Sequence, residues 1–158
     1  MRSRFLAVVV AAAAVAVLPL LAAAQAPVHS SAAVKFGPGP DFLPPGAGFA
    51  VLQGDPSKSG VYTIRLRLPN NYKIPSHFHP TDEHVTVLQG TFLVGMGETI
   101  DTTKAQRLGA GGFITALANA HHFAVARGVT ILQVSGEGPF LITYVKESED
   151  PRHAHATP

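Results

Sequence analysis

The stretch from Pro75 to Gly90 constrains the fold of this chain more than any other part of the sequence. His77 and His79 stand two residues apart, so on an extended strand both side chains leave the same face. Residues 80–82 interrupt that strand with a proline, and Glu83 opens a second apolar run that ends at Gly90. Two imidazoles and a carboxylate from adjacent strands are three ligands of a first-row metal site. We therefore expect a fourth ligand, another histidine, from a distant strand.

A His-x-His pair alone is weak evidence for metal binding. The chain has 8 histidines, and a second such pair lies in residues 153–155, near the C-terminus. The full spacing is more specific, because His77-x-His79-x-x-x-Glu83-x-x-x-x-x-x-Gly90 resembles the first motif of the cupin superfamily.

A second stretch, residues 111–123, is similar to the second cupin motif, which normally reads Gly…Pro-x-Gly-x-x-His. In this alignment Leu117 stands at the proline position, Asn119 at the glycine position and His122 at the ligand position. The resemblance covers roughly residues 62–144 and implies one metal ion bound inside a barrel. The implied metal ligands are His77, His79, Glu83 and His122.

The departures from the family motifs are compatible with the fold. Asn71 replaces the glycine that usually starts the first motif, and Asn119 replaces the glycine of the second. Asparagine is the residue best able to take the positive φ that such a glycine usually has. His121 lies beside His122, and adjacent strand residues face opposite ways, so only one of them can face the barrel interior. The family spacing, three residues after Asn119, selects His122.

The first 24 residues predict a secretory signal peptide. Arg2 and Arg4 precede an apolar run over residues 5–21, and Ala22–Ala24 supplies a small-residue cleavage site. An uncleaved membrane anchor is the alternative, but the run is short for a membrane span and contains Pro19. We expect a periplasmic or secreted protein with no membrane attachment after cleavage. With no cysteine, it has no disulfide bond.

The charge balance argues against nucleic acid as a partner. Removing the signal peptide leaves ten Lys and Arg residues, which balance the 10 acidic residues. No stripe of Lys and Arg crosses the body of the sequence. A small-molecule ligand or substrate is the expected partner.

The body of the chain has the pattern of an all-β domain. In Val61–Leu68, apolar residues alternate with Thr and Arg, which is typical of a half-buried strand in an antiparallel sheet. Other apolar runs follow at about ten-residue spacing between Gly and Pro turns, which indicates a sandwich or barrel. The runs around Gly90 predict a hairpin. The cupin resemblance narrows the fold to an antiparallel jelly-roll barrel. The runs predicted as strands are Phe49–Gln53, Val61–Leu68, Val85–Leu88, Thr91–Val94, Phe113–Ala116, His122–Ala126, Val129–Ser135 and Phe140–Lys146.

These patterns divide the chain into four segments. Residues 1–24 are the signal peptide, and residues 25–48 are a Pro/Gly-rich N-terminal arm lying over the body. Residues 49–146 are the cupin domain, and residues 147–158 are a charged tail expected to be disordered. Family habit and the need to cover exposed sheet edges imply a homodimer.

Three imidazoles and one carboxylate suit Fe(II), Mn(II), Ni(II), Cu(II) or Zn(II) and leave positions open for water or substrate. Because an open position distinguishes catalytic from structural sites, the first hypothesis is an exported metalloenzyme, oxygenase-like, that acts on a small organic substrate. The second is a non-catalytic metal- or ligand-binding module, such as a sensor. It is favoured because the sequence offers no clear catalytic residue: Asp82, His84 and His121 flank the ligands but read as surface or supporting groups. The third hypothesis is a jelly roll that binds no metal and whose histidine cluster is incidental.

Overall fold

The structure is a computed structural model that describes residues 27–153, so the predicted signal peptide and the end of the tail lie outside the described residues. Every strand pairing among these residues is antiparallel, which confirms the all-β prediction. No helix within residues 27–153 is long and apolar enough to cross a membrane. The strands are β1 (Gly37–Pro38), β2 (Gly48–Gln53), β3 (Gly60–Leu68), β4 (Lys73–Phe78), β5 (Glu83–Met96), β6 (Gln106–Leu108), β7 (Phe113–Ala116), β8 (His122–Gly138) and β9 (Thr143–Tyr144).

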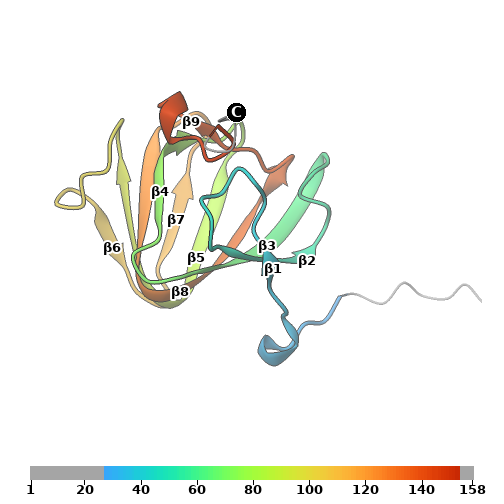
Figure 1. Cartoon of the computed structure of the whole chain (residues 1–158). Coiled ribbons are helices and arrows are strands. Elements are labelled where there is room, and N and C mark those ends of the chain that lie inside the picture. The colour runs from blue at the N-terminus through green and yellow to red at the C-terminus, as the bar shows by residue number, and fades with distance from the viewer. Residues whose placement is uncertain (1–26, 154–158) are drawn as a thin grey trace, which may run out of the picture.

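Two long strands, β5 and β8, hold the barrel together (Figure 1). They pair along their whole lengths, from Glu83 opposite Gly136 to Met96 opposite His122. The C-terminal part of β8 also pairs with β3, whereas its N-terminal part pairs with β4. One face of the barrel therefore has the order β1-β2-β3-β8-β5-β7, and the other has the order β9-β4-β8-β5-β6. Both faces surround one interior, as in a jelly roll.

The predicted hairpin at Gly90 was wrong, because β5 continues through this residue. Gly90 has a φ of 80°, and the register of β5 against β8 shifts between Val87 and Gln89 and again across Gly90, between Gln89 and Thr91. A β-carbon added at Gly90 would lie 2.5 Å from the carbonyl oxygen of Val129, so only glycine fits. A positive-φ glycine at a register shift bends a strand as a β-bulge does, without reversing it. Gly128, with a φ of 71°, occupies the corresponding bend of β8, which was predicted as two strands.

The C-terminal region also differs from the prediction. The expected strand Phe140–Lys146 is reduced to the two residues of β9. The described part of the expected disordered tail is ordered, with a 3-10 helix at Glu147–Glu149. Asp150 is buried there and accepts a hydrogen bond of 2.6 Å from Arg152, which also donates to a backbone carbonyl. This ion pair gives residues 147–153 a fixed position that composition did not predict.

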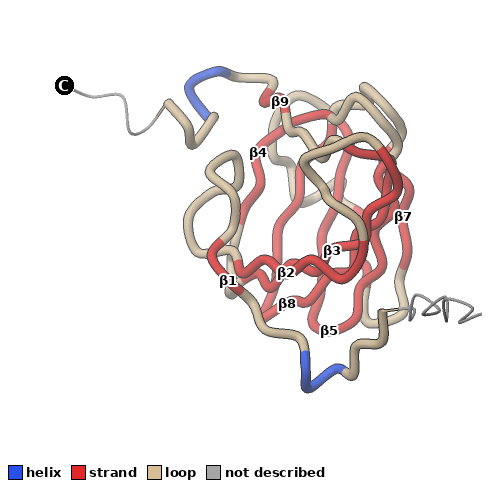
Figure 2. Tube along the Cα trace, turned by 90° about the vertical axis from the view of Figure 1, so that its right-hand side faces the viewer, coloured by secondary structure: helices blue, strands red, loops and turns tan. Residues whose placement is uncertain are grey.

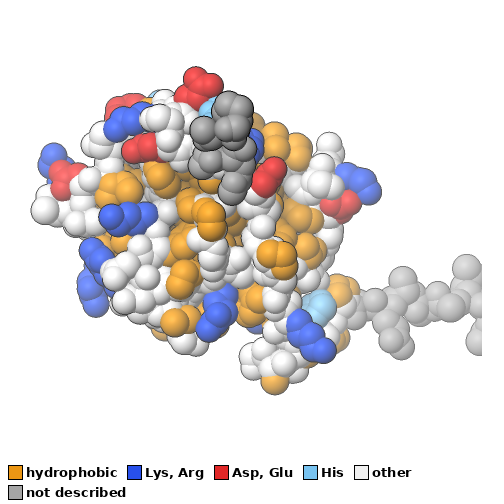
Figure 3. All heavy atoms as spheres, viewed as in Figure 1, with side chains coloured by type: hydrophobic (Ala, Val, Ile, Leu, Met, Phe, Trp, Pro, Cys, Tyr) orange, Lys and Arg blue, Asp and Glu red, His pale blue; other side chains and the backbone are white. Residues whose placement is uncertain are grey.

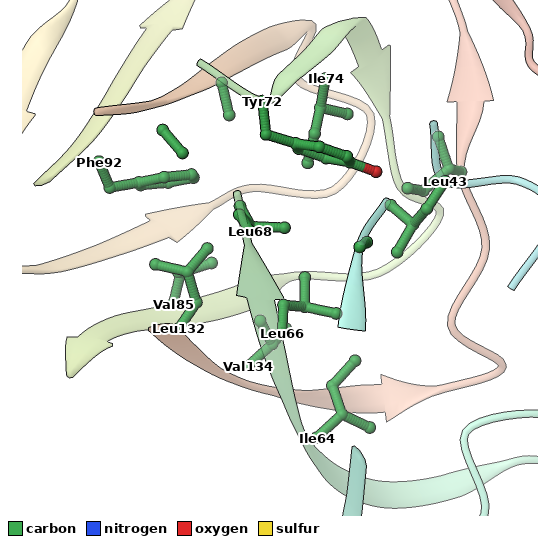
Figure 4. Packing of buried hydrophobic residues seen from close by; sticks show 14 of the residues in the cluster. Leu43, Ile64, Leu66, Leu68, Tyr72, Ile74, Val85, Phe92, Leu132 and Val134 are labelled. Atoms are coloured by element: carbon green, nitrogen blue, oxygen red, sulfur yellow. The ribbon is translucent and has the colours of Figure 1, made fainter. Parts of the chain in front are cut away.

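The core lies between the two faces of the barrel (Figure 4). The predicted alternation in β3 holds, because Ile64, Leu66 and Leu68 are buried while Arg67 is exposed. Leu132 of β8 joins these residues in the same cluster. Each such side chain stabilises the fold by about 1.5–3 kcal/mol through burial.

Between β1 and β2 the N-terminal arm passes in front of the strands in Figure 1 and lies on their left in Figure 2, across one side of the barrel, whereas its described beginning lies below the barrel in both views. Leu43 in this segment is buried in the core. The hydroxyl of Tyr144 donates a hydrogen bond of 2.8 Å to the carbonyl of Phe42, and that of Tyr72 donates to the carbonyl of Pro44. Hydrophobic side chains gather across the middle of this side (Figure 3). The arm therefore closes the interior with apolar groups.

Candidate metal centre

Two connections bring the candidate ligands to one place in the barrel. His79 directly follows β4, and His122 is the first residue of β8. The N–H of Asn119 donates a hydrogen bond of 2.8 Å to the carbonyl of His79, and the N–H of Ala118 donates to the carboxylate of Asp82 at 2.8 Å. Asn119 has a φ of 60°, which confirms the conformation expected of a residue in the glycine position. The turn before His122 is thus fixed to the turn that follows His79.

The same expectation holds at the start of the first motif. Asn71 has a φ of 63°. Its side-chain oxygen accepts a hydrogen bond of 2.6 Å from Arg127, so asparagine supports this turn with a contact that glycine cannot make.

Three histidines form a buried cluster. One ring nitrogen from each of His77, His79 and His122 lies within 4.8 Å of those of the other two. The ring centres of His77 and His122 are 4.2 Å apart, and those of His77 and His79 are 5.0 Å apart. Oε2 of Glu83 lies 3.4 Å from Nε2 of His79. All four side chains belong to residues that are at most 8% exposed. The structure therefore brings together the four residues that the cupin motifs select, and from here on the cluster means these four residues.

The hydrogen bonds of the three rings determine which nitrogen is free. Nδ1 of His77 lies 2.7 Å from the carbonyl of Pro75, and Nδ1 of His79 lies 2.7 Å from the carbonyl of Leu141. Nδ1 of His122 lies 2.9 Å from the carbonyl of Ala120. A carbonyl only accepts, so each Nδ1 donates its proton and each neutral ring keeps a lone pair on Nε2.

The Nε2 atom of His79 tests whether a cation fits. This atom is buried and has no hydrogen-bond partner among residues 27–153. Its neighbour at 3.4 Å is the carboxylate of Glu83, which also accepts. Buried polar atoms without partners are rare in folded proteins, and several acceptors facing one another are satisfied by a metal ion. The donor set therefore fits a divalent cation.

The electrostatics of the cluster prepare His77, His122 and Glu83 as metal ligands, whereas a proton competes with a metal for His79. Burial, together with the neighbouring rings of His122 and His79, lowers the pKa of His77 to about 3. Burial also lowers the pKa of His122. Burial disfavours charge on Glu83 as well, but His79 beside it outweighs that effect and lowers the pKa of the carboxyl. The same contact outweighs burial at His79 and raises its pKa. At neutral pH the cluster thus offers neutral rings at His77 and His122 and an ionised carboxylate.

The flanking polar residues face away from the cluster. His121 points to the rim, where its Nδ1 lies 2.7 Å from Oε1 of Glu98 and its ring stacks on Phe78. His84 is exposed, with Nδ1 3.1 Å from the hydroxyl of Thr115, as strand alternation predicts. The ambiguity between adjacent histidines is resolved in favour of His122 as the one that joins the cluster.

The cluster borders an interior cavity of about 30 Å³. A cavity of this size holds roughly two water molecules. Apart from the four side chains of the cluster, the described residues that line it are all aliphatic or aromatic. The sequence did not predict this lining, because an apolar strand residue reads as core whether or not it borders a cavity.

Comparisons with known proteins support the fold. A family model described as "Domain of unknown function (DUF4437)" matches residues 35–156, and no curated protein matches the chain. The polyketide cyclase RemF from Streptomyces resistomycificus is similar in structure, with a TM-score of 0.61 and 20% identity over 85% of this chain and 94% of that one.

Two further solved structures show the same likeness. A proposed acetylacetone dioxygenase from Methylibium petroleiphilum PM1 has a TM-score of 0.60 and 20% identity, covering 84% of this chain and 89% of that one. An RmlC-like cupin from Shewanella frigidimarina NCIMB 400 has a TM-score of 0.54 and 13% identity, covering 72% and 91%. These likenesses confirm the cupin fold, and at such identities they carry no activity over to this chain.

Proposed function

We propose a metal-dependent function for this chain, which belongs to the DUF4437 family and has the cupin fold. The metal is one divalent ion held by His77, His79, Glu83 and His122. The observation that carries the proposal is the set of Nε2 lone pairs and one carboxylate facing one another in a buried site, with Nε2 of His79 unpartnered among the described residues.

The chain's own groups prepare this site. The backbone carbonyls of Pro75, Leu141 and Ala120 hold the three rings by their Nδ1 atoms, so the lone pairs face the same point before any ion binds. Ligands fixed in this way lose little conformational entropy on binding. A divalent ion that takes five or six ligands would keep at least one position open beside the four protein ligands, and there it would act as a Lewis acid toward a small molecule.

We favour an oxygenase-like metalloenzyme acting on a small organic substrate. Two structurally similar proteins are described as a cyclase and a proposed dioxygenase, which supports chemistry in such a barrel without fixing the reaction. The second candidate is a non-catalytic module that binds a metal or small ligand. His84 and His121 point outward, so among the described residues the only titratable groups that line the cavity are the four proposed ligands. The cavity then has no separate acid or base for catalysis, which favours this candidate.

The place of action belongs to the same proposal. A signal peptide over residues 1–24 would deliver the protein to the periplasm or the exterior. There it would act as a homodimer on a small molecule.

Metal content tests the proposal. We expect protein purified from its native compartment to contain about one metal ion per chain by elemental mass spectrometry, and the His77→Ala variant to contain none. Iron, manganese or copper would support the oxygenase, whereas zinc alone would favour the second candidate. Wild-type protein that stays metal-free after incubation with each of these ions would contradict the metal-dependent function and leave only a module that binds a small ligand.

A further inference from the structure

The interior cavity and the outer surface share one wall. Outside the barrel lies a groove of about 280 Å³, lined by Pro40, Phe42, Phe49, Pro139, Phe140 and Leu141, with Pro56 and Ser57 at its edge. Phe140 also lines the interior cavity beside the histidine cluster. None of the described residues that line the groove carries a charge. The groove is thus an apolar space separated from the cluster by one aromatic side chain.

The contacts of Phe140 place its ring between the two spaces. The ring stacks on His79, with centres 5.7 Å apart and an interplanar angle of 21°. It meets Phe42 of the arm edge to face at 5.5 Å, and it lies 5.6 Å from the ring of Tyr62. Its backbone N–H donates a hydrogen bond of 2.7 Å to the carbonyl of Pro56. The main chain is therefore fixed, and opening this 5%-exposed wall requires rotation of the side chain about its χ angles.

The next residue links the groove to the cluster directly. The side chain of Leu141 lines the groove and is 47% exposed, whereas its carbonyl accepts the Nδ1 proton of His79. A molecule in the groove would therefore contact the segment that orients one of the proposed metal ligands.

The two spaces together have the size of a ligand site. The cavity alone admits only a few non-hydrogen atoms, but rotation of Phe140 would join it to the groove. The joined space reaches about 300 Å³, where small-molecule sites begin. Its lining limits the chemistry of the occupant, because a phosphate, carboxylate or ammonium group that leaves water for this lining meets no opposite charge away from the cluster.

We infer that this protein takes a small, uncharged molecule with an apolar body and one polar end, and that Phe140 is the gate through which this end reaches the metal centre. The inference rests on the proposed function for the role of the polar end. The apolar body lies in the groove against Phe42, Phe49 and Leu141. Sugars, nucleotides and dianionic acids fit poorly, because outside the cluster only Ser57 of the described lining has a side chain that can form hydrogen bonds, and none carries a charge.

The test compares two probes that share a methyl ketone and differ at the far end. 2-Hexanone ends in a methyl group, and levulinate ends in a carboxylate. Binding is measured by ligand-observed NMR, which needs no metal, on protein whose metal content is determined in parallel. We expect saturable binding of 2-hexanone and at least about tenfold weaker binding of levulinate, since the carboxylate would lose its hydration. Levulinate binding within twofold of the ketone, or no binding of the ketone, overturns the inference.

Two leucine variants test the gate. Phe140→Leu opens the wall, whereas Phe92→Leu enlarges the cavity from a residue that lines it without lining the groove. The association rate of 2-hexanone is taken from the exchange broadening of its NMR signals. Relative to the wild type, we expect it to be at least about fivefold faster in Phe140→Leu and unchanged in Phe92→Leu. Equal rates in the two variants would overturn the gate. If Phe140→Leu does not fold, as judged by circular dichroism, Leu141→Trp takes its place. This substitution fills the groove from an exposed position and should slow entry to a similar extent, and an unchanged rate would equally overturn the gate.

The outcomes separate this inference from the proposed function. Protein that holds its metal but prefers levulinate contradicts only the ligand class. Protein that binds 2-hexanone but no metal contradicts only the metal-dependent function.

Discussion

Substituting the two adjacent histidines one at a time should have opposite consequences for metal binding. His122 is 3% exposed and its ring centre lies 4.2 Å from that of His77, so His122→Ala removes one of the four proposed ligands. The side chain of His121 is 37% exposed and its Nδ1 contacts Glu98 at the rim, so His121→Ala removes an exposed hydrogen bond worth about 1 kcal/mol or less. We expect only the first variant to lose its metal.

The magnitude follows from mass action. Zinc at one hundred times its Kd stabilises the folded state by about 2.7 kcal/mol, which for a domain of this size is roughly 10 °C in Tm. If the loss of one ligand weakens binding about a thousandfold, the same zinc concentration gives about 0.06 kcal/mol, less than 1 °C. Each variant is compared with itself with and without zinc, so any loss of stability in the metal-free protein cancels.

Differential scanning fluorimetry measures these shifts, and elemental analysis of dialysed protein measures occupancy. His77→Ala serves as the positive control for loss of a ligand. If His121→Ala abolishes the zinc shift while His122→Ala keeps it, the ligand assignment is wrong by one residue. If neither substitution matters, the ion does not bind at this cluster.

Four further predictions concern the rest of the chain. Gly90→Ala should lower the free energy of unfolding in urea by more than about 2 kcal/mol, because the positive φ and the close backbone both oppose a β-carbon. At Gly128 nothing lies within 4 Å, so Gly128→Ala should cost only the backbone strain of about 1–2 kcal/mol. Equal costs would contradict the steric argument. The hydrogen bonds from Arg152 hold the pKa of Asp150 below its ordinary value of 3.8. The stability that they contribute is therefore complete near neutral pH and is lost as the pH falls through the lowered pKa. Asp150→Asn should flatten the dependence of unfolding free energy on pH below about pH 4, and an unchanged dependence would refute this. Intact mass of the natively exported protein should start near Gln25, and retention of the leader would contradict export. Light scattering should give twice the mass of one chain, and a monomer at high concentration would contradict the dimer.

Three of the four residues of the candidate metal centre were predictable because their spacing is local. His77, His79 and Glu83 lie within seven residues, and strand alternation alone decides their faces. His122 needed the turn at Asn119, whose positive φ follows from the residue type and can therefore be expected from the sequence alone.

The bends and the C-terminal order were not predictable from local patterns. Gly90 reads equally well as a turn or a bulge, and the choice depends on pairing with β8, about forty residues away. In the sequence, Asp150 and Arg152 are indistinguishable from ordinary surface charges. In the structure, Arg152 also donates a hydrogen bond to the carbonyl of Ile142, and this contact orders the segment. The role of Phe140 as a shared wall depends on the arm and the barrel together, which no short window of sequence contains.

The shared strands have a consequence for how the protein opens. Because β5 and β8 belong to both faces of the barrel, neither face can separate without breaking the ladder that also holds the other. Amide hydrogens in this ladder should exchange with solvent only through global unfolding, while those of the arm and of β9 exchange through local opening. Glu83 and His122 begin these two strands, so half of the cluster is attached to the slowest-exchanging part of the molecule. The ring of His79 is held by the carbonyl of Leu141, two residues before β9, so we expect local opening there to release His79 first among the proposed ligands.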